Sequence, residues 1–126
     1  MELRLNTKRI RIDLEEKPDY LLFFVTGEYN LEDFKILVQG CRDECVRAGF
    51  VKAMVDIREV LGDIPNFERH TLGQMFAEVW GGRLRAGILS PRDRVNKLFE
   101  NTAVNRYAQV MVHNEEQKIL DWLSAP

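Results

Sequence analysis

Polar and apolar residues alternate over residues 9–14, where Ile10, Ile12 and Leu14 are separated by charged side chains. A period of two is typical of a strand with one buried face, and the charges on its other face suit the edge of a sheet. Residues 20–25 are apolar at every position, which is typical of a strand covered on both faces. Because the proline and charges between them favour a turn, we predict that the two strands form a hairpin.

Apolar residues then recur at spacings of three and four between Leu31 and Ala48. This period predicts an amphipathic helix. Asn30 is the expected N-cap, because its side chain can accept hydrogen bonds from the backbone N–H groups of the first turn. Gly49 is expected to end the helix in a conformation with positive φ.

Three further short apolar runs are predicted to be strands, at residues 53–57, 84–89 and 109–113. Their lack of strict alternation favours positions inside a sheet that is covered on both faces. Residues 58–62, which follow the first of these strands, are predicted to be a loop.

A helix is predicted after each of these strands. The first is expected to be capped by Asp63 or Asn66 and to stop at Gly81. A short helix is predicted over residues 95–103. The terminal helix is expected to be capped by Asn114, in a capping box completed three residues later.

The predicted order of elements is therefore β-β-α-β-α-β-α-β-α, an α/β fold. Strands that alternate with helices favour right-handed crossovers and a mostly parallel sheet, here five-stranded with one antiparallel edge strand and four helices. The length of 126 residues fits one domain spanning residues 1–126.

Composition narrows the function classes. Hydrophobic residues make up 45% and the formal net charge is −2, which argues against disorder and against a dedicated nucleic-acid binder. The longest apolar run, residues 20–25, is too short to span a membrane. No signal-peptide pattern is recognised, so a cytoplasmic location is expected. The stretch 83–106 is locally basic, with six basic and two acidic residues. It predicts either a patch for an acidic partner, another subunit or anionic lipid, or a solvated face.

The chain resembles the STAS family, and within it the SpoIIAA-like branch, also called STAS/SEC14-like. The resemblance is carried by FVTGEY at residues 24–29, MVDIR at 54–58 and AGIL at 86–89. It continues through VMVHNE at 110–115 to the DWL ending at 121–123. It implies a SpoIIAA-like fold with strands in progressive order.

The resemblance also implies a non-enzymatic interaction or regulatory module. The better-known STAS proteins antagonise anti-sigma factors and are switched by phosphorylation of a serine after the third strand. The matching residues here, 56–66, contain no hydroxyl side chain, so the resemblance does not extend to that switch. Other proteins of this fold bind lipids or small apolar ligands, which makes a carrier or sensor of a small apolar or anionic ligand the alternative.

Several polar residues are predicted to gather where parallel strands end and helices begin. Ligands of open α/β sheets bind at this edge, and helix N-termini favour anions. The alternative is that each residue is a cap or is solvated separately. The candidates are Asp56, Arg58, His70, Ser90, Arg92 and His113.

The predicted helix before Gly81 is the second candidate site. Its apolar stripe, which includes Met75 and Trp80, is wide for a helix that only covers a sheet. Such a stripe predicts a homodimer interface or an apolar pocket, and the alternative is plain core packing. A pocket would favour the carrier, whereas a flat self-complementary patch would favour the interaction module.

No catalytic or metal site is predicted. Cys41 and Cys45 share a helix face, but they fall on its apolar stripe, where free cysteines behave as small hydrophobes. Two thiolates alone would also leave a metal short of ligands. No phosphate-binding loop, nucleophile elbow or zinc-binding motif occurs, so neither an enzyme nor a cofactor is expected.

Overall fold

The structure is a computed structural model that describes residues 9–126. The elements follow one another as β1 (Ile10–Glu16), β2 (Leu21–Glu28), α1 (Leu31–Ala48), β3 (Lys52–Leu61), α2 (Asn66–Trp80), β4 (Arg85–Leu89), the short 3-10 helix η1 (Arg92–Arg94), α3 (Leu98–Val104), β5 (Gln109–His113) and α4 (Glu116–Ser124). The β-β-α-β-α-β-α-β-α order predicted from the sequence is confirmed.

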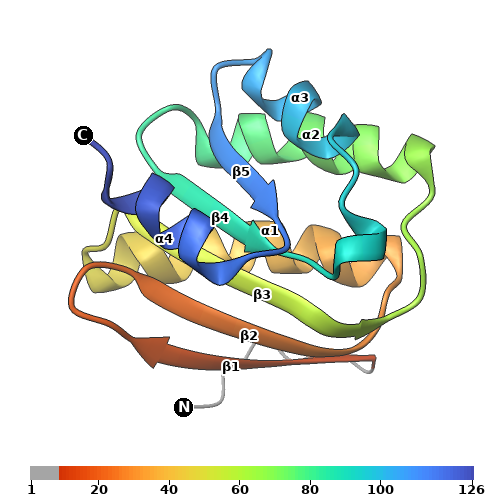
Figure 1. Cartoon of the computed structure of the whole chain (residues 1–126), viewed down its shortest axis with the longest axis horizontal. Helices are drawn as coiled ribbons and strands as arrows, with labels where there is room; N and C mark the ends of the chain where they lie inside the picture. Colours follow the sequence, from red (N-terminus) through yellow and green to blue (C-terminus); the bar gives the residue numbers. More distant parts are fainter. Residues whose placement is uncertain (1–8) are drawn as a thin grey trace.

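The five strands form one sheet in the order β1-β2-β3-β4-β5 (Figure 1). β1 pairs with β2 antiparallel, and the remaining pairs are parallel. Since each parallel crossover is right-handed and the strand order never reverses, α1, α2 and α3 must lie on the same face of the sheet. The remaining helix, α4, lies across the opposite face (Figure 1).

The helix α1 begins and ends where the sequence predicts. The Asn30 side chain accepts a hydrogen bond from the backbone N–H of Asp33 at 2.9 Å. Gly49 adopts φ 80° at the other end, and two backbone N–H groups close the final turn: Phe50 donates to Cys45 and Gly49 to Val46. Both termini therefore have their backbone groups satisfied by local residues.

The core is divided by the sheet into two parts. The larger part lies between the sheet and helices α1–α3 and includes Phe23, Cys41, Cys45 and Trp80. The smaller part lies under α4 and is built from Met54, Leu89, Ile119 and Leu123. The two cysteines are free and buried, as expected from their place on the apolar stripe of α1.

One prediction of local structure is wrong at residues 58–62. The strand β3 continues to Leu61, because β2 also continues past a bulge after Phe24 and pairs with it as far as Glu28. Val60 is buried and gives this extension an apolar anchor. Arg58 and Glu59, which precede Val60, interrupt the apolar pattern, so the sequence did not indicate a strand here. Pairing with β2 in the tertiary structure stabilises it.

Two predicted helix caps are also wrong. The N-cap of α2 is Pro65, with no side-chain hydrogen bond, and that of α4 is Glu115 instead of Asn114. The side chain that serves the start of α4 is His113, whose Nδ1 accepts from the Glu115 backbone N–H at 2.9 Å. A residue at the end of a strand thus replaces the expected Asn cap.

Gly87 lets α4 approach the sheet. A Cβ at this position would overlap the Cγ2 of Ile119. We therefore expect Gly87→Ala to lower the free energy of unfolding by about 1–3 kcal/mol through overpacking. Urea unfolding measures this loss. In an Ile119→Ala background the same substitution should be much less destabilising, and an equal loss in both backgrounds would contradict the contact.

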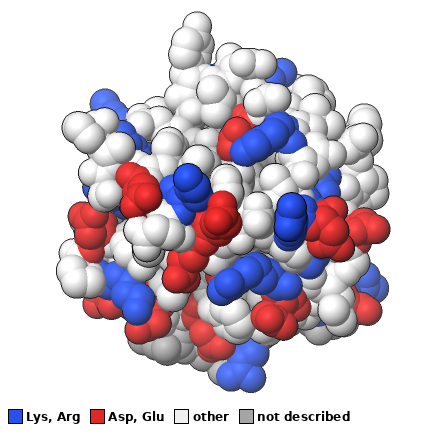
Figure 2. Space-filling model, viewed as in Figure 1, with Lys and Arg blue, Asp and Glu red and all other residues white. Residues whose placement is uncertain are grey.

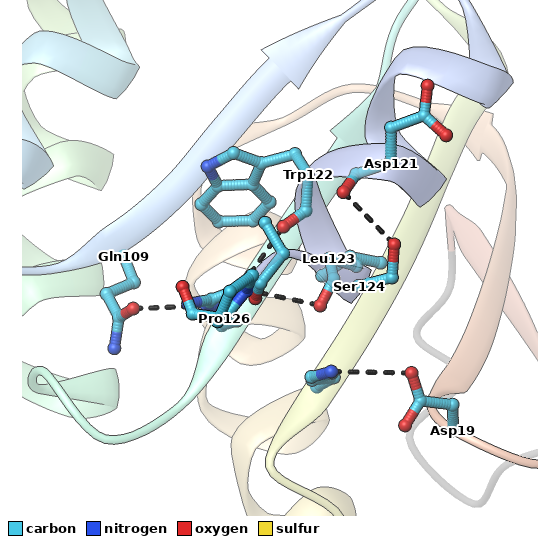
Figure 3. Close-up of polar contacts among 10 residues, drawn as sticks. Asp19, Gln109, Asp121, Trp122, Leu123, Ser124 and Pro126 are labelled. Carbon is cyan, nitrogen blue, oxygen red and sulfur yellow. Dashed lines mark hydrogen bonds and ion pairs between the residues drawn. The ribbon is translucent and has the colours of Figure 1, made fainter.

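Arg85 ties the end of the chain to the sheet. Its Nη1 lies within hydrogen-bond distance of the backbone carbonyls of Trp122, Leu123 and Ala125, at 3.1, 3.4 and 2.6 Å, while its Nε donates to Gln109 at 3.1 Å. Figure 3 shows Gln109, Trp122, Leu123 and Pro126 gathered here. The guanidinium also lies 5.4 Å from the ring centroid of Trp122. A cation at the carbonyl end of a helix stabilises it through the helix dipole as well as through these bonds.

We expect Arg85→Met to lower the free energy of unfolding by about 1–3 kcal/mol, because hydrogen bonds from a charged donor are lost. Amide hydrogen exchange should accelerate in α4 more than in α1. The matched control is Arg83→Met, since Arg83 is exposed and should change stability by less than about 0.5 kcal/mol. Equal losses from both variants would contradict the role of Arg85.

Candidate functional site

An apolar pocket of about 80 Å³ lies between helices α1 and α2 and the face of the sheet that they cover. Alternate residues of the central strands point to this face, so the sheet forms its floor. The helices supply aliphatic, aromatic and thiol side chains. The apolar lining consists of Phe34, Leu37, Val38, Cys41, Val55, Ile57, Ile64, Leu72, Phe76, Trp80, Ile88, Phe99 and Val112.

Four polar residues also line the pocket: Arg69, Ser90, Arg94 and Asn96. They come from the first turns of α2 and from the segment after β4. These segments meet at the carboxyl edge of the parallel strands, which is where open α/β sheets bind ligands. The pocket therefore combines an apolar interior with a polar mouth at that edge.

Arg69 is held in place at this mouth by backbone carbonyls. Its Nε donates to Ile64 at 2.9 Å, and its Nη1 donates to the carbonyl of Arg94 at 3.2 Å. Arg94 in turn donates from Nη1 to the carbonyl of Gly62 at 3.0 Å. The two guanidinium groups therefore link the connection between β3 and α2 to the segment after β4 by hydrogen bonds.

The electrostatics of the mouth are positive. Desolvation lowers the pKa of Arg69, the Coulomb field of Asp63 acts in the opposite direction, and the smaller effect of the Arg94 charge lowers the pKa as well. Among residues 9–126, no carboxylate forms an ion pair with either guanidinium. The region thus has two neighbouring cations without a paired anion.

The residues predicted to share one site are divided between the two faces of the sheet. Asp56 and Arg58 lie on the α4 face of β3, where they form a self-contained pair. The Arg58 guanidinium donates to both Asp56 oxygens at 3.1 and 2.8 Å, and its backbone N–H donates at 3.0 Å. Asp56 is 4% exposed, and its carboxylate raises the pKa of Arg58. This pair is bonded within itself on the α4 face, and neither residue lines the apolar pocket.

The two predicted histidines are also far apart in the fold. His70, on α2, places Nδ1 3.2 Å from the hydroxyl of Thr102 on α3. His113 ends β5 on the α4 face, where it accepts from the backbone of Glu115. Each histidine has a local structural partner, and the structure does not bring them together.

The remaining predicted residues divide in the same way. Trp80 lines the pocket and donates from Nε1 to the Val38 carbonyl at 3.0 Å, which joins α2 to α1. Met75 is half-buried on α2 and outside the pocket, and Arg92 is exposed in η1. The wide stripe of α2 therefore serves both core and pocket, while Arg69 and Arg94 were missed. Their signal in the sequence was weak, since both are ordinary arginines at element boundaries.

The basic stretch 83–106 does not form one patch. Arg85 and Arg106 lie at the amino edge of the strands, whereas Arg94 and Lys97 lie at the carboxyl edge. Lys97 pairs with Glu100 at 3.2 Å and donates to the Val112 carbonyl at 2.7 Å. Over the α4 face, acidic and basic side chains are interspersed (Figure 2). The local concentration of charge that matters is the arginine pair at the pocket mouth.

Within residues 9–126, no group of three or more His, Cys, Asp or Glu residues is placed to hold a metal ion. None of the helices described is long and apolar enough to cross a membrane.

Comparison with solved structures identifies the fold. An anti-sigma factor antagonist from Mycobacterium paratuberculosis matches with a TM-score of 0.63 and 13% identity, over 99% of this chain and 100% of that one. An uncharacterised DUF3478-family protein with a SpoIIAA-like fold, from Shewanella loihica, matches with a TM-score of 0.49 and 23% identity, over 94% of this chain and 96% of that one. No family model and no curated protein matches the sequence. The chain therefore shares the α/β fold of the anti-sigma factor antagonist, with a five-stranded sheet and one antiparallel edge strand, as expected from the resemblance.

Proposed function

We propose that the chain is a non-enzymatic sensor or carrier that binds a small molecule with an apolar part in the pocket under α1 and α2. The observation that carries this proposal is the pocket itself, whose walls are almost entirely apolar and include Trp80 of α2. Small-molecule sites are typically concave and apolar with a few polar groups, as found here. A cytoplasmic location belongs to the same proposal.

The second candidate is a protein-interaction module, with a protein partner or a second copy of the chain. It is favoured by the fold shared with an anti-sigma factor antagonist. Two apolar side chains are also exposed around the connection from β3 to α2, Leu61 at 65% and Phe67 at 79%. A ligand in the pocket would lie beside this surface, since Ile64 of the same connection lines the pocket.

The binding proposal is tested with 1-hexanol as an uncharged probe, followed by NMR amide shifts. We expect shifts for residues of α1, α2 and β3 around the pocket. Val55→Phe, which adds a ring to the pocket floor, should weaken 1-hexanol binding at least tenfold. The control is Val51→Phe, at an exposed position, which should leave binding unchanged. Equal binding by both folded variants would contradict the proposed site.

The interaction candidate predicts a different result. Light scattering should show a dimer or a complex that is lost on Phe67→Ser, with 1-hexanol shifts intact. A monomer at high concentration that captures no partner would count against it, whatever the pocket binds.

A further inference from the structure

The donors at the pocket mouth are only partly used. Arg69 donates one hydrogen bond from Nε and one from Nη1 to backbone carbonyls, and Arg94 donates one from Nη1. A guanidinium offers five N–H donors, so Nη2 of both side chains and Nε of Arg94 are not engaged by other residues of the described chain. Both groups are anchored, so their remaining donors are already oriented.

Ser90 adds a third donor, from the strand side of the pocket. It is 3% exposed and lines the pocket just beyond the end of β4. Its backbone N–H donates to the His113 carbonyl at 3.0 Å, whereas its hydroxyl makes no hydrogen bond with any other residue in the described range 9–126. The hydroxyl oxygen is not sealed in the core, since no buried side-chain polar atom of the described residues lacks a partner, and it can therefore bond a ligand in the pocket.

Neither of the two nearby acidic residues bonds to the arginine pair. Glu68, beside Arg69 in α2, instead accepts a hydrogen bond from the hydroxyl of Tyr29 at 2.7 Å. Burial, followed by that bond, raises the pKa of Tyr29, so the tyrosine stays a neutral donor. Asp63 acts on Arg69 only through its Coulomb field. The field of Asp63 offsets part of the charge on Arg69, but no carboxylate of the described residues bonds either guanidinium, so the free donors of the pair remain open to a ligand.

We propose that the pocket takes an amphipathic oxyanion, with its carboxylate or phosphate head on Arg69, Arg94 and Ser90 and a short alkyl chain among the apolar side chains. This inference rests on the proposed binding function and specifies its ligand class. A cavity of about 80 Å³ exceeds the ~10–15 Å³ that one water needs and is smaller than the ~150 Å³ cavity that takes up benzene, which favours a short chain. Guanidinium groups form short, charge-assisted hydrogen bonds to such heads.

The experiment compares four probes on the whole protein by calorimetry: hexanoate, hexyl phosphate, 1-hexanol and hexylamine. We expect the two anions to bind at least tenfold more tightly than 1-hexanol, and hexylamine to bind more weakly than 1-hexanol. The stronger of the two anions shows which head fits. From acetate to butanoate, affinity should rise about three- to fourfold per methylene and then level off towards hexanoate, since the small cavity admits only the first few carbons.

Arg94→Gln is the main variant, because its side chain makes only one hydrogen bond within the described structure. It should weaken binding of the preferred anion five- to twentyfold and leave 1-hexanol unchanged. Ser90→Ala should weaken the anion about three- to tenfold. The matched control is Arg92→Gln, which removes an exposed charge two residues away and should change neither affinity by more than twofold.

Equal affinities for hexanoate, hexyl phosphate and 1-hexanol would overturn the oxyanion assignment. The proposal that the pocket binds small apolar molecules would be unaffected. Loss of 1-hexanol and anion binding to the same extent in Arg94→Gln would overturn it as well. If none of the four probes binds the unmodified protein, the proposed binding function fails, and the oxyanion assignment fails with it.

Discussion

Replacing Trp80 by alanine should lower the free energy of unfolding by about 3–5 kcal/mol, the typical loss for a buried tryptophan. Trp80 is 4% exposed, stacks on Phe76 with ring centroids 4.9 Å apart, and joins α2 to α1 through its hydrogen bond to Val38. Since a domain has only about 5–15 kcal/mol in total, this variant should be close to unfolding at 37 °C. Urea unfolding followed by circular dichroism measures the loss.

Two variants separate the contributions. Trp80→Phe keeps a ring against Phe76 but removes the indole donor, so it should cost less than alanine does. Trp122→Ala is the matched control, because Trp122, on α4, is only half-buried and loses less contact area. A cost below about 1 kcal/mol for Trp80→Ala would show that the contact between α1 and α2 does not support the fold.

The thiols of Cys41 and Cys45 should be almost inert in the folded protein. Burial raises the pKa of Cys45 to about 12, and it raises that of Cys41 well above its usual value. At pH 8 the thiolate fraction of Cys45 should therefore fall roughly a thousandfold below that of an exposed cysteine with a pKa of about 8.5. Alkylation by iodoacetamide should be slowed at least as much, and it should reach the exposed rate in denaturant. Fast alkylation of the folded chain would contradict the buried positions.

The same shifts make stability depend on alkaline pH. In the unfolded chain the thiols lose their protons near pH 8.5, whereas in the folded chain Cys45 keeps its proton until about pH 12. Their contribution is thus complete below pH 8.5 and decreases by about 1.4 kcal/mol per pH unit per thiol as pH rises through this window. Urea unfolding between pH 8 and 11 measures the slope. The variant with both cysteines replaced by alanine should lose this part of the slope and keep the part due to other groups.

The helix α1 and the order of elements were predictable from local sequence. Three signals define this helix: the spacing of its apolar residues, the cap at Asn30 and the stop at Gly49. Each acts within one or two turns, so no distant contact is needed to interpret it. The strand extension to Leu61 was not predictable in this way, because its stability comes from pairing with β2. The predicted cap of α4 was wrong for a similar reason, because the side chain that accepts from its first turn is His113, at the end of a strand.

The candidate site shows the same division between local and tertiary information. The sequence showed that the apolar stripe of α2 is wider than a sheet-covering helix needs. This stripe supplies one wall of the pocket, which includes Trp80. That the polar candidates separate by strand face could have been read in part from the alternation along β3, which places Asp56 and Arg58 together. Which face carries the pocket depended on the handedness of the crossovers.

By itself, the sequence of this protein determined the α/β class, the order of its strands and helices and the buried character of its cysteines, because periodicity and end signals are local properties. Only the tertiary structure decided that Arg69, Arg94 and Ser90 meet at the mouth of an apolar pocket. These three come from α2 and from the segment after β4, which are distant in the chain. Their meeting depends on how the parallel sheet aligns its carboxyl edge, which no single segment specifies.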